Sequence, residues 1–298
     1  MLFPKIFKEE SIKFKGVDFN FAHGGIKSRR TIPLLLIHGY PQTHIMWHKV
    51  VEKLAEKYYV ICPDLIGYGD SSKPRGMPDH KNYSKKSMAE DMINIMDYLM
   101  IDEFYIAGHD RGARVAHRMC LDYPERVRKA CLMDIAPTYH MFENTDKSFA
   151  TGYYHWFFLI QPDNLPETLI RENPKYYLTE KLKRWSDKDV DFYEKFDEEA
   201  VKEYVRCFDE DSIHATCEDY RAAATIDMED DENDRKTKLK IPLLVLWGKY
   251  GFINKTYDVL NVWKDYALNV NGKALECGHF LPEEKPKEVI EEMIKFFK

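Results

Sequence analysis

The sequence predicts an α/β fold with a mostly parallel, doubly wound sheet, because two kinds of segment alternate along the chain. Short apolar runs rich in β-branched residues are typical of buried strands, and apolar residues spaced by three and four are typical of amphipathic helices. Their alternation favours helices that connect parallel strands. Strands are predicted at residues 34–38, 58–62, 104–108, 130–135, 243–247 and 273–276, after a hairpin-like pair at 11–21, and helices at 50–57, 88–99, 115–121, 259–266 and 287–297.

One long interval interrupts this alternation. Residues 137–226 contain no convincing strand, and their helical stretches are dense in aromatic side chains. We therefore expect a core made of residues 1–136 and 227–298, with residues 137–226 inserted as a helical cap. The charged run 229–240 is interpreted as a solvated connection back to the sheet. Ligands of such sheets bind beyond the carboxyl ends of the strands, so a cap over that edge would exclude water from the site.

Composition excludes several classes of function. Of the 298 residues, 44% are hydrophobic and 32% are charged, which is typical of a soluble globular protein. The net charge of -6 argues against a nucleic-acid partner, and no apolar stretch is long enough to span a bilayer. The six cysteines are scattered, without the spacing of a metal site. We expect a cytoplasmic protein with reduced thiols, no metal, no cofactor, and no secretory signal at its N-terminus.

The strongest local signal is the segment Gly108-His109-Asp110-Arg111-Gly112 between a predicted strand and a predicted helix. Its spacing is that of the G-x-S-x-G nucleophile elbow, with aspartate at the central position. A carboxylate is ionised at neutral pH and needs no base to attack a saturated carbon. Asp110 is therefore the candidate nucleophile. The alternative is that Asp110 merely caps the following helix.

A candidate base and its orienting acid lie further along the chain. His279 follows the last predicted strand, in the chain order nucleophile, acid, base, and its pKa suits general base catalysis. Asp134 ends an apolar run, where a buried carboxylate requires a partner, whereas Asp258 is the first acid after the strand at 243–247. We assign the orienting role to Asp134. His38 is expected to brace the turn that follows the strand at 34–38.

Anion-binding groups are predicted around the nucleophile. The backbone N–H groups of Tyr40 and Arg111 are placed to hold an oxyanion. The side chains of Arg111 and Arg114 lie three residues apart at a helix start and converge near Asp110. Two adjacent buried cations are unfavourable unless an anion joins them, and guanidinium groups suit bidentate binding of a carboxylate. Each arginine has the alternative of a surface or cap-facing ion pair.

At these residues the chain resembles the haloacetate dehalogenases of the α/β-hydrolase fold, and most closely the fluoroacetate dehalogenases. The resemblance covers nearly the full length and rests on HGYPQTH at 38–44, GHDRGAR at 108–114, YHW at 154–156, CEDYRA at 217–222 and GHF at 278–280. It implies a homodimer and hydrolysis of a small 2-haloacid such as haloacetate or fluoroacetate, through an ester of Asp110. It implies a triad of Asp110, Asp134 and His279, carboxylate binding by Arg111 and Arg114, and halide binding by His155, Trp156 and Tyr220. His109, Met141 and Trp185 are expected to line the pocket, with Met141 standing where some members carry tyrosine.

Three alternatives remain open. An epoxide hydrolase would use the same triad with two tyrosines of the cap to protonate the epoxide oxygen. Tyr220 would be one of them, and Tyr139, Tyr153 or Tyr154 the other. A haloalkane dehalogenase is less compatible, since that family usually has tryptophan where Arg111 stands. A ligand-binding protein without turnover would keep the fold alone.

Overall fold

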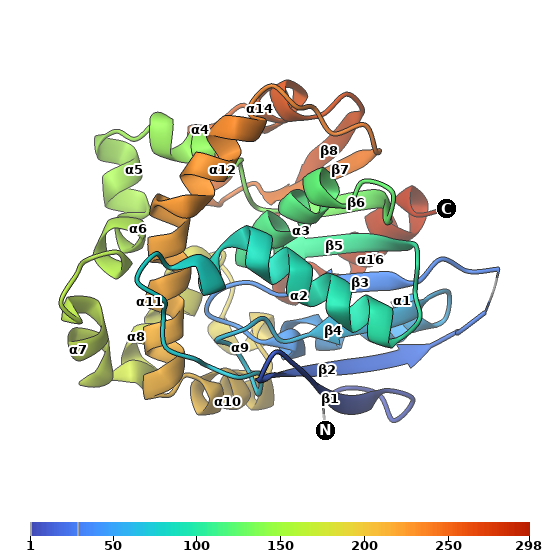
Figure 1. The fold of residues 1–298 in the computed structure, drawn as a ribbon, viewed down its shortest axis with the longest axis horizontal. Helices are drawn as coiled ribbons and strands as arrows, with labels where there is room; N and C mark the ends of the chain where they lie inside the picture. The colour runs from blue at the N-terminus through green and yellow to red at the C-terminus, as the bar shows by residue number, and fades with distance from the viewer. Residues whose placement is uncertain (1, 29) are drawn as a thin grey trace.

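An eight-stranded sheet forms the centre of the computed structural model, which describes residues 2–28 and 30–298 (Figure 1). The strand order is β1-β2-β4-β3-β5-β6-β7-β8. β1 and β2 form the predicted hairpin, β2 also pairs antiparallel with β4, and the remaining pairs are parallel. This confirms the predicted fold class. The strands are β1 (Lys8–Phe14), β2 (Val17–Gly25), β3 (Leu34–Ile37), β4 (Tyr59–Pro63), β5 (Phe104–His109), β6 (Val127–Met133), β7 (Leu243–Gly248) and β8 (Val270–Leu275).

Helices cover both faces of the sheet. Figure 1 shows α2 and α3 across the near face, while α1 packs with α16. Every residue of β3, β4, β5 and β7 is buried, which explains why these strands are continuous apolar runs. The helices of this core are α1 (His48–Ala55), α2 (Lys85–Tyr98), α3 (Arg111–Asp122), α13 (Phe252–Thr256), α14 (Val259–Tyr266), α15 (Leu281–Glu284) and α16 (Pro286–Phe296), with 3-10 turns at His44–Trp47 and Lys81–Tyr83.

The chain between β6 and β7 forms a helical insertion that lies beyond one end of the sheet (Figure 1). The interpretation of residues 229–240 as a connection is wrong for their first half, because α12 continues to Asp234. Asp227 in the first turn of α12 is buried and accepts a hydrogen bond from the backbone N–H of Lys85. The boundaries of a separate cap domain stay a prediction. The insertion comprises α4 (Thr138–Glu143), α5 (Lys147–Gly152), α6 (Tyr154–Leu159), α7 (Leu165–Arg171), α8 (Pro174–Trp185), α9 (Phe192–Lys195), α10 (Glu198–Cys207), α11 (Glu210–Ala224) and α12 (Ile226–Asp234).

None of the helices formed by residues 2–28 and 30–298 has the length and apolar character needed to cross a bilayer.

The turn between β5 and α3 depends on close backbone contact. A Cβ atom at Gly112 would lie 2.2 Å from the carbonyl oxygen of His38 and 2.3 Å from that of Ile37. Backbone atoms cannot move aside as a flexible side chain can, so only glycine lets α3 start against the end of β3. The same contact brings Asp110 next to the loop after β3.

Gly112→Ala should therefore lower the free energy of unfolding by roughly 2 kcal/mol or more, because the added methyl group forces α3 away from β3. Urea unfolding followed by circular dichroism measures this change. Lys287→Ala, on the exposed surface of α16, is the control and should unfold like the parent protein. Equal stability of Gly112→Ala and the control would contradict the tight packing of the turn.

Candidate active site

Asp110 lies on the sharp turn between β5 and α3. Its backbone has φ 48° and ψ −116°, a conformation that few residues other than glycine adopt. It occupies the N-cap position of α3, yet its side chain accepts no capping hydrogen bond. Instead, Asp110 Oδ1 accepts a hydrogen bond of 3.0 Å from the backbone N–H of Tyr40. The alternative role as a helix cap is thus excluded, and the strained backbone serves to present the carboxylate.

The carboxylate of Asp110 is ionised. Burial would raise its pKa, but the neighbouring charges of His279, Arg114 and Arg111 outweigh burial and lower the pKa below its ordinary value. The candidate nucleophile therefore needs no base to become charged.

His279 connects Asp110 with Asp134. His279 Nδ1 lies 2.5 Å from Asp134 Oδ2, and His279 Nε2 lies 3.8 Å from Asp110 Oδ2 without a hydrogen-bond partner. The second oxygen of Asp134 accepts from the backbone N–H of Gly248 at 2.8 Å, which fixes the carboxylate. Asp258 instead caps α14 through the N–H of Asn261, so the assignment of the orienting acid to Asp134 agrees with the geometry.

The pKa of His279 reflects this pair. Burial lowers it, but the hydrogen bond and the charge of Asp134 outweigh burial, and the pKa lies above the ordinary 6.5. His279 accordingly gains a proton readily on the nitrogen that faces Asp110. Its backbone N–H donates to Trp185 O at 2.8 Å, so α8 of the helical insertion also holds the histidine loop.

Two other histidines support the site without joining the triad. His38 Nε2 accepts from the backbone N–H of Leu65 at 3.1 Å and its Nδ1 contacts the carbonyl of Gly39, so His38 braces the turn as predicted. His109 Nε2 donates to the carbonyl oxygen of His279 at 2.7 Å, and its ring centre lies 4.5 Å from that of His279. Burial and the charge of His279 lower the pKa of His109 to about 3. His109 is therefore neutral.

The two candidate oxyanion donors are not equal in this structure. The N–H of Tyr40 already contacts Asp110 Oδ1, whereas within residues 2–28 and 30–298 no hydrogen bond joins the N–H of Arg111 to that carboxylate. A Cβ atom at Gly39 would lie 2.5 Å from Asp110 Cβ, so glycine is required before Tyr40 for the two segments to approach.

For Arg111 the structure shows the alternative, an ion pair with the helical insertion. Its guanidinium donates to Asp219 of α11, from Nε to Oδ2 at 2.9 Å and also from Nη2 to Oδ1. Nη1 remains buried without a partner, so Arg111 offers a ligand one nitrogen rather than a bidentate pair. Asp219 shares one face of α11 with Ala215 and Ala222, at a spacing of four and three. An acid on such a face predicts a buried cation opposite it, and this signal was missed.

Arg114 has no carboxylate partner in the part of the chain that the structure describes. Its Nη1 donates to Ala136 O at 3.0 Å and to Thr138 Oγ1 at 2.9 Å, and its Nη2 lies 3.3 Å from the sulfur of Met141. Nε is buried and unpartnered. Burial and the charge of Arg111 lower the pKa of Arg114. Arg114 thus forms no ion pair among the described residues, and the charge of Asp110 only partly offsets its burial.

The three residues that the resemblance assigns to halide come together from two helices. His155 and Trp156 lie on α6 and Tyr220 on α11, with ring centres 5.6 Å apart for His155 and Tyr220 and 6.3 Å apart for Trp156 and Tyr220. The hydroxyl of Tyr220 and Nδ1 of His155 are buried without partners. Tyr220 also stacks under the Arg111 guanidinium at 4.3 Å. The two arginines lie against these rings, Arg111 over Tyr220 and Arg114 over Trp156 at 4.8 Å.

Of the other tyrosines considered, only Tyr153 remains near the triad. Tyr139 contacts Arg235 through its hydroxyl, and the hydroxyl of Tyr154 accepts a hydrogen bond from Lys181. Tyr153 is buried and its pKa is raised by burial and by the charge of Asp134.

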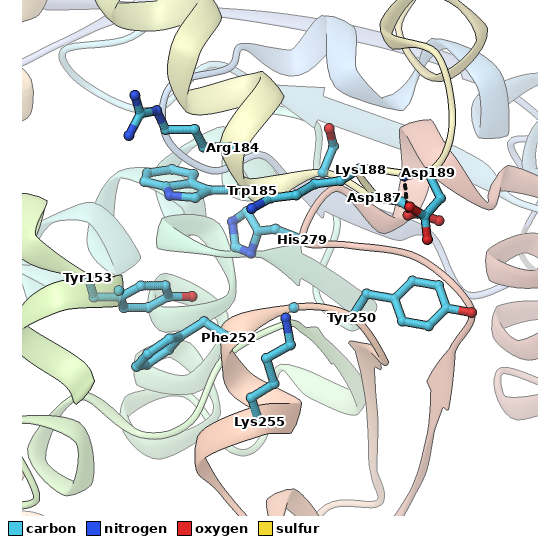
Figure 2. A pocket seen from close by; sticks show the side chains of 13 residues that line it. Tyr153, Arg184, Trp185, Asp187, Lys188, Asp189, Tyr250, Phe252, Lys255 and His279 are labelled. Atoms are coloured by element: carbon cyan, nitrogen blue, oxygen red, sulfur yellow. Dashed lines mark hydrogen bonds between the residues drawn. The ribbon is translucent and has the colours of Figure 1, made fainter.

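A cavity of about 440 Å³ leads from the surface to His279, between the helical insertion and the core (Figure 2). Figure 2 shows the rings of Tyr153, Trp185 and Phe252 beside His279, and Lys255 pointing toward the same space. Asp110 and Arg114 do not line it, so the cavity lies on the outer side of the histidine. Phe252 was not expected here; it follows β7, whose carboxyl end lies at this edge.

Asp134→Asn should lower the pKa of His279 relative to the parent, because the hydrogen bond and the charge of Asp134, the largest effects that oppose burial, are then lost. Titration of the histidine ring protons by NMR measures this pKa, and His279→Asn identifies the resonance. In the parent protein the same resonance should titrate above 6.5. Equal pKa values in the parent and in Asp134→Asn would contradict the pairing.

Comparisons with known proteins agree with this geometry. Residues 32–286 match the profile of the family described as alpha/beta hydrolase fold. The chain is 41% identical over 256 residues to a fluoroacetate dehalogenase of Burkholderia sp, and the aligned region covers 86% of this chain and 83% of that protein. It is 35% identical over 271 residues to a soluble epoxide hydrolase of Corynebacterium sp. (strain C12), and this aligned region covers 89% of this chain and 90% of that protein.

A crystal structure from Nostoc sp PCC 7120 superimposes with a TM-score of 0.94 and 53% identity over 98% of both chains. The family profile and the fluoroacetate dehalogenase together bear out the resemblance read from the motifs. The chain belongs to the alpha/beta hydrolase fold family and is a member similar to the haloacetate dehalogenases.

Proposed function

We propose that this protein is a hydrolytic dehalogenase of small 2-haloacids, which converts haloacetate and water to glycolate and halide. The observation that carries the proposal is the buried guanidinium of Arg114, which has no carboxylate partner among the described residues and lies beside the nucleophile. A buried cation without a counter-charge is costly, and a substrate carboxylate would relieve that cost. Arg114 Nε and Arg111 Nη1 are the free donors for it.

In the first step, Asp110 attacks the carbon that bears the halogen. Oδ1 is held by the N–H of Tyr40, which leaves Oδ2 as the attacking oxygen. A C–O bond to Asp110 forms as the carbon–halogen bond breaks, and halide leaves with the bonding electron pair. The N–H and O–H groups of His155, Trp156 and Tyr220 are the donors for the departing halide.

In the second step, water hydrolyses the ester at the carboxyl carbon of Asp110. His279 Nε2, which faces Oδ2, removes a proton from the water, and Asp134 stabilises the resulting imidazolium. Negative charge develops on Oδ1, where the N–H of Tyr40 already donates. Collapse releases glycolate, His279 returns its proton, and Asp110 keeps one oxygen from the water.

An epoxide hydrolase is the second candidate, because Tyr153 and Tyr220 lie near the triad and a soluble epoxide hydrolase is a relative. Its substrate is neutral, however, and would leave Arg114 without a counter-charge. We also propose that residues 137–226 act as a cap and that the protein is a homodimer. Exposed apolar side chains of the helical insertion, Leu165, Leu169 and Tyr176, offer a surface for pairing.

His279→Asn should stop after the first step, because alkylation of Asp110 needs no base and hydrolysis does. Incubation with chloroacetate should give an intact-protein mass with one carboxymethyl group, mapped to Asp110 by peptide analysis. The parent protein should release chloride from chloroacetate, assayed beside fluoride release from fluoroacetate and diol formation from styrene oxide. Diol without halide would replace the dehalogenase with the epoxide hydrolase, and neither product would favour a binding protein without turnover.

Arg114→Leu should reduce kcat/KM for chloroacetate by roughly 30-fold or more, since losing a buried charged partner costs about 2–5 kcal/mol. Turnover of the neutral analogue chloroacetamide should not fall in parallel. Arg128→Leu, at an exposed position of β6, is the control and should match the parent. A near-normal rate of Arg114→Leu with chloroacetate would remove the argument for an anionic substrate.

A further inference from the structure

Lys181 of α8 is a buried cation that the proposed reaction does not use. Its side chain is 2% exposed, and its ammonium donates to the hydroxyl of Tyr154 at 2.7 Å. The ammonium lies over three aromatic rings, 4.0 Å from the centre of Tyr154, 4.8 Å from that of Tyr177 and 5.3 Å from that of Trp185. No carboxylate of residues 2–28 or 30–298 lies within ion-pair distance of it.

Such an environment is unfavourable for a lysine. Burial and the neighbouring charge of Arg184 lower its pKa to about 7. Ring faces attract a cation but compensate only part of the lost hydration. A methionine of similar length would fill the same space without that cost. Packing alone therefore gives no reason for a charge at this position.

The location of Lys181 supplies a reason. The Trp185 ring that contacts the ammonium also contacts His155, with ring centres 4.5 Å apart. Burial first, and then the charge of Lys181, keep the pKa of His155 well below its ordinary value. Lys181 thus acts electrostatically on the residues assigned to the halide, and no intervening carboxylate offsets its charge.

We propose that Lys181 stabilises the departing halide through its charge, from behind the His155 and Trp185 rings and without touching the halide. This inference rests on the proposed dehalogenase function and deepens it. In a buried site, where water screens charges weakly, a cation attracts an anion on the far side of a side-chain ring even without contact. It acts on the leaving group, whereas Arg114 acts on the carboxylate. The two charges are therefore separable by experiment.

Lys181→Met tests the proposal with sodium bromide as the probe, because bromide binding needs no turnover. At pH 6.5, titration by tryptophan fluorescence should show a dissociation constant about three- to tenfold higher than that of the parent. The melting temperature should rise, since an unfavourable buried charge is removed. Lys183→Met, exposed on the same helix, is the matched control and should change neither quantity.

The outcomes separate this inference from the proposed function. Unchanged bromide affinity in Lys181→Met, while the parent releases halide from chloroacetate, overturns the role of Lys181 alone. Weaker bromide binding with a lower melting temperature would indicate a packing role and overturns it as well. A parent protein that neither releases halide nor binds bromide overturns the proposed function. Should Lys181→Met fail to fold, Lys181→Gln removes the same charge with a polar side chain and is read in the same way.

Discussion

One buried carboxylate, that of Asp219, joins the helical insertion to the sheet. It accepts hydrogen bonds from Arg111, from the hydroxyl of Tyr68 and from the ammonium of Lys85, all of which belong to the core. These charges outweigh burial and hold the pKa of Asp219 far below its ordinary value. A charge so deeply buried is tolerable only when all its hydrogen-bond partners are present. The hydrogen bonds of Asp219 therefore fix the position of α11 on the core. Tyr220, the next residue, is thereby placed over Arg111.

This contact also gives Arg111 and Arg114 different electrostatic surroundings. Lys85 contacts a second acid, Asp227, so the cluster of Arg111, Lys85, Asp219 and Asp227 carries two positive and two negative charges. Arg114 lies outside this balanced cluster. The chain as a whole has a net charge of -6, and the local excess at Arg114 has the opposite sign. Under the proposed function, recognition of one small anion would depend on Asp219 pairing with Arg111 and leaving Arg114 without an ion pair.

Sequence patterns predicted the sheet well where strands are buried on both faces, and less well elsewhere. β3, β5 and β7 were predicted to within a residue at each end, because both faces of these strands select apolar side chains. β8 starts three residues earlier than predicted, since Asn271 and Gly272 in its first half are typical of turns rather than of strands. Asp110, Asp134 and His279 could be identified as candidate catalytic residues from the sequence, because each lies at the end of a predicted strand or in the loop that follows it. Asp219 was missed although its place on an apolar face of α11 is a signal for a buried cation. Lys181 was missed because a lysine on a polar-looking helix gives no sign that its ammonium is buried against Tyr154.

The two oxygens of Asp110 have different surroundings, and this difference separates what the sheet determines from what the insertion determines. Oδ1 faces the N–H of Tyr40 and Oδ2 faces His279, and both partners come from loops at the carboxyl ends of strands. An ester formed on Oδ2 and hydrolysed by His279 would follow from this arrangement whether the substrate were a haloacid or an epoxide. The choice between them is made by other groups, namely the uncompensated Arg114 and the donors on α6 and α11. Under the proposed function, a change in the helical insertion would therefore alter the substrate while the sheet keeps the same chemistry.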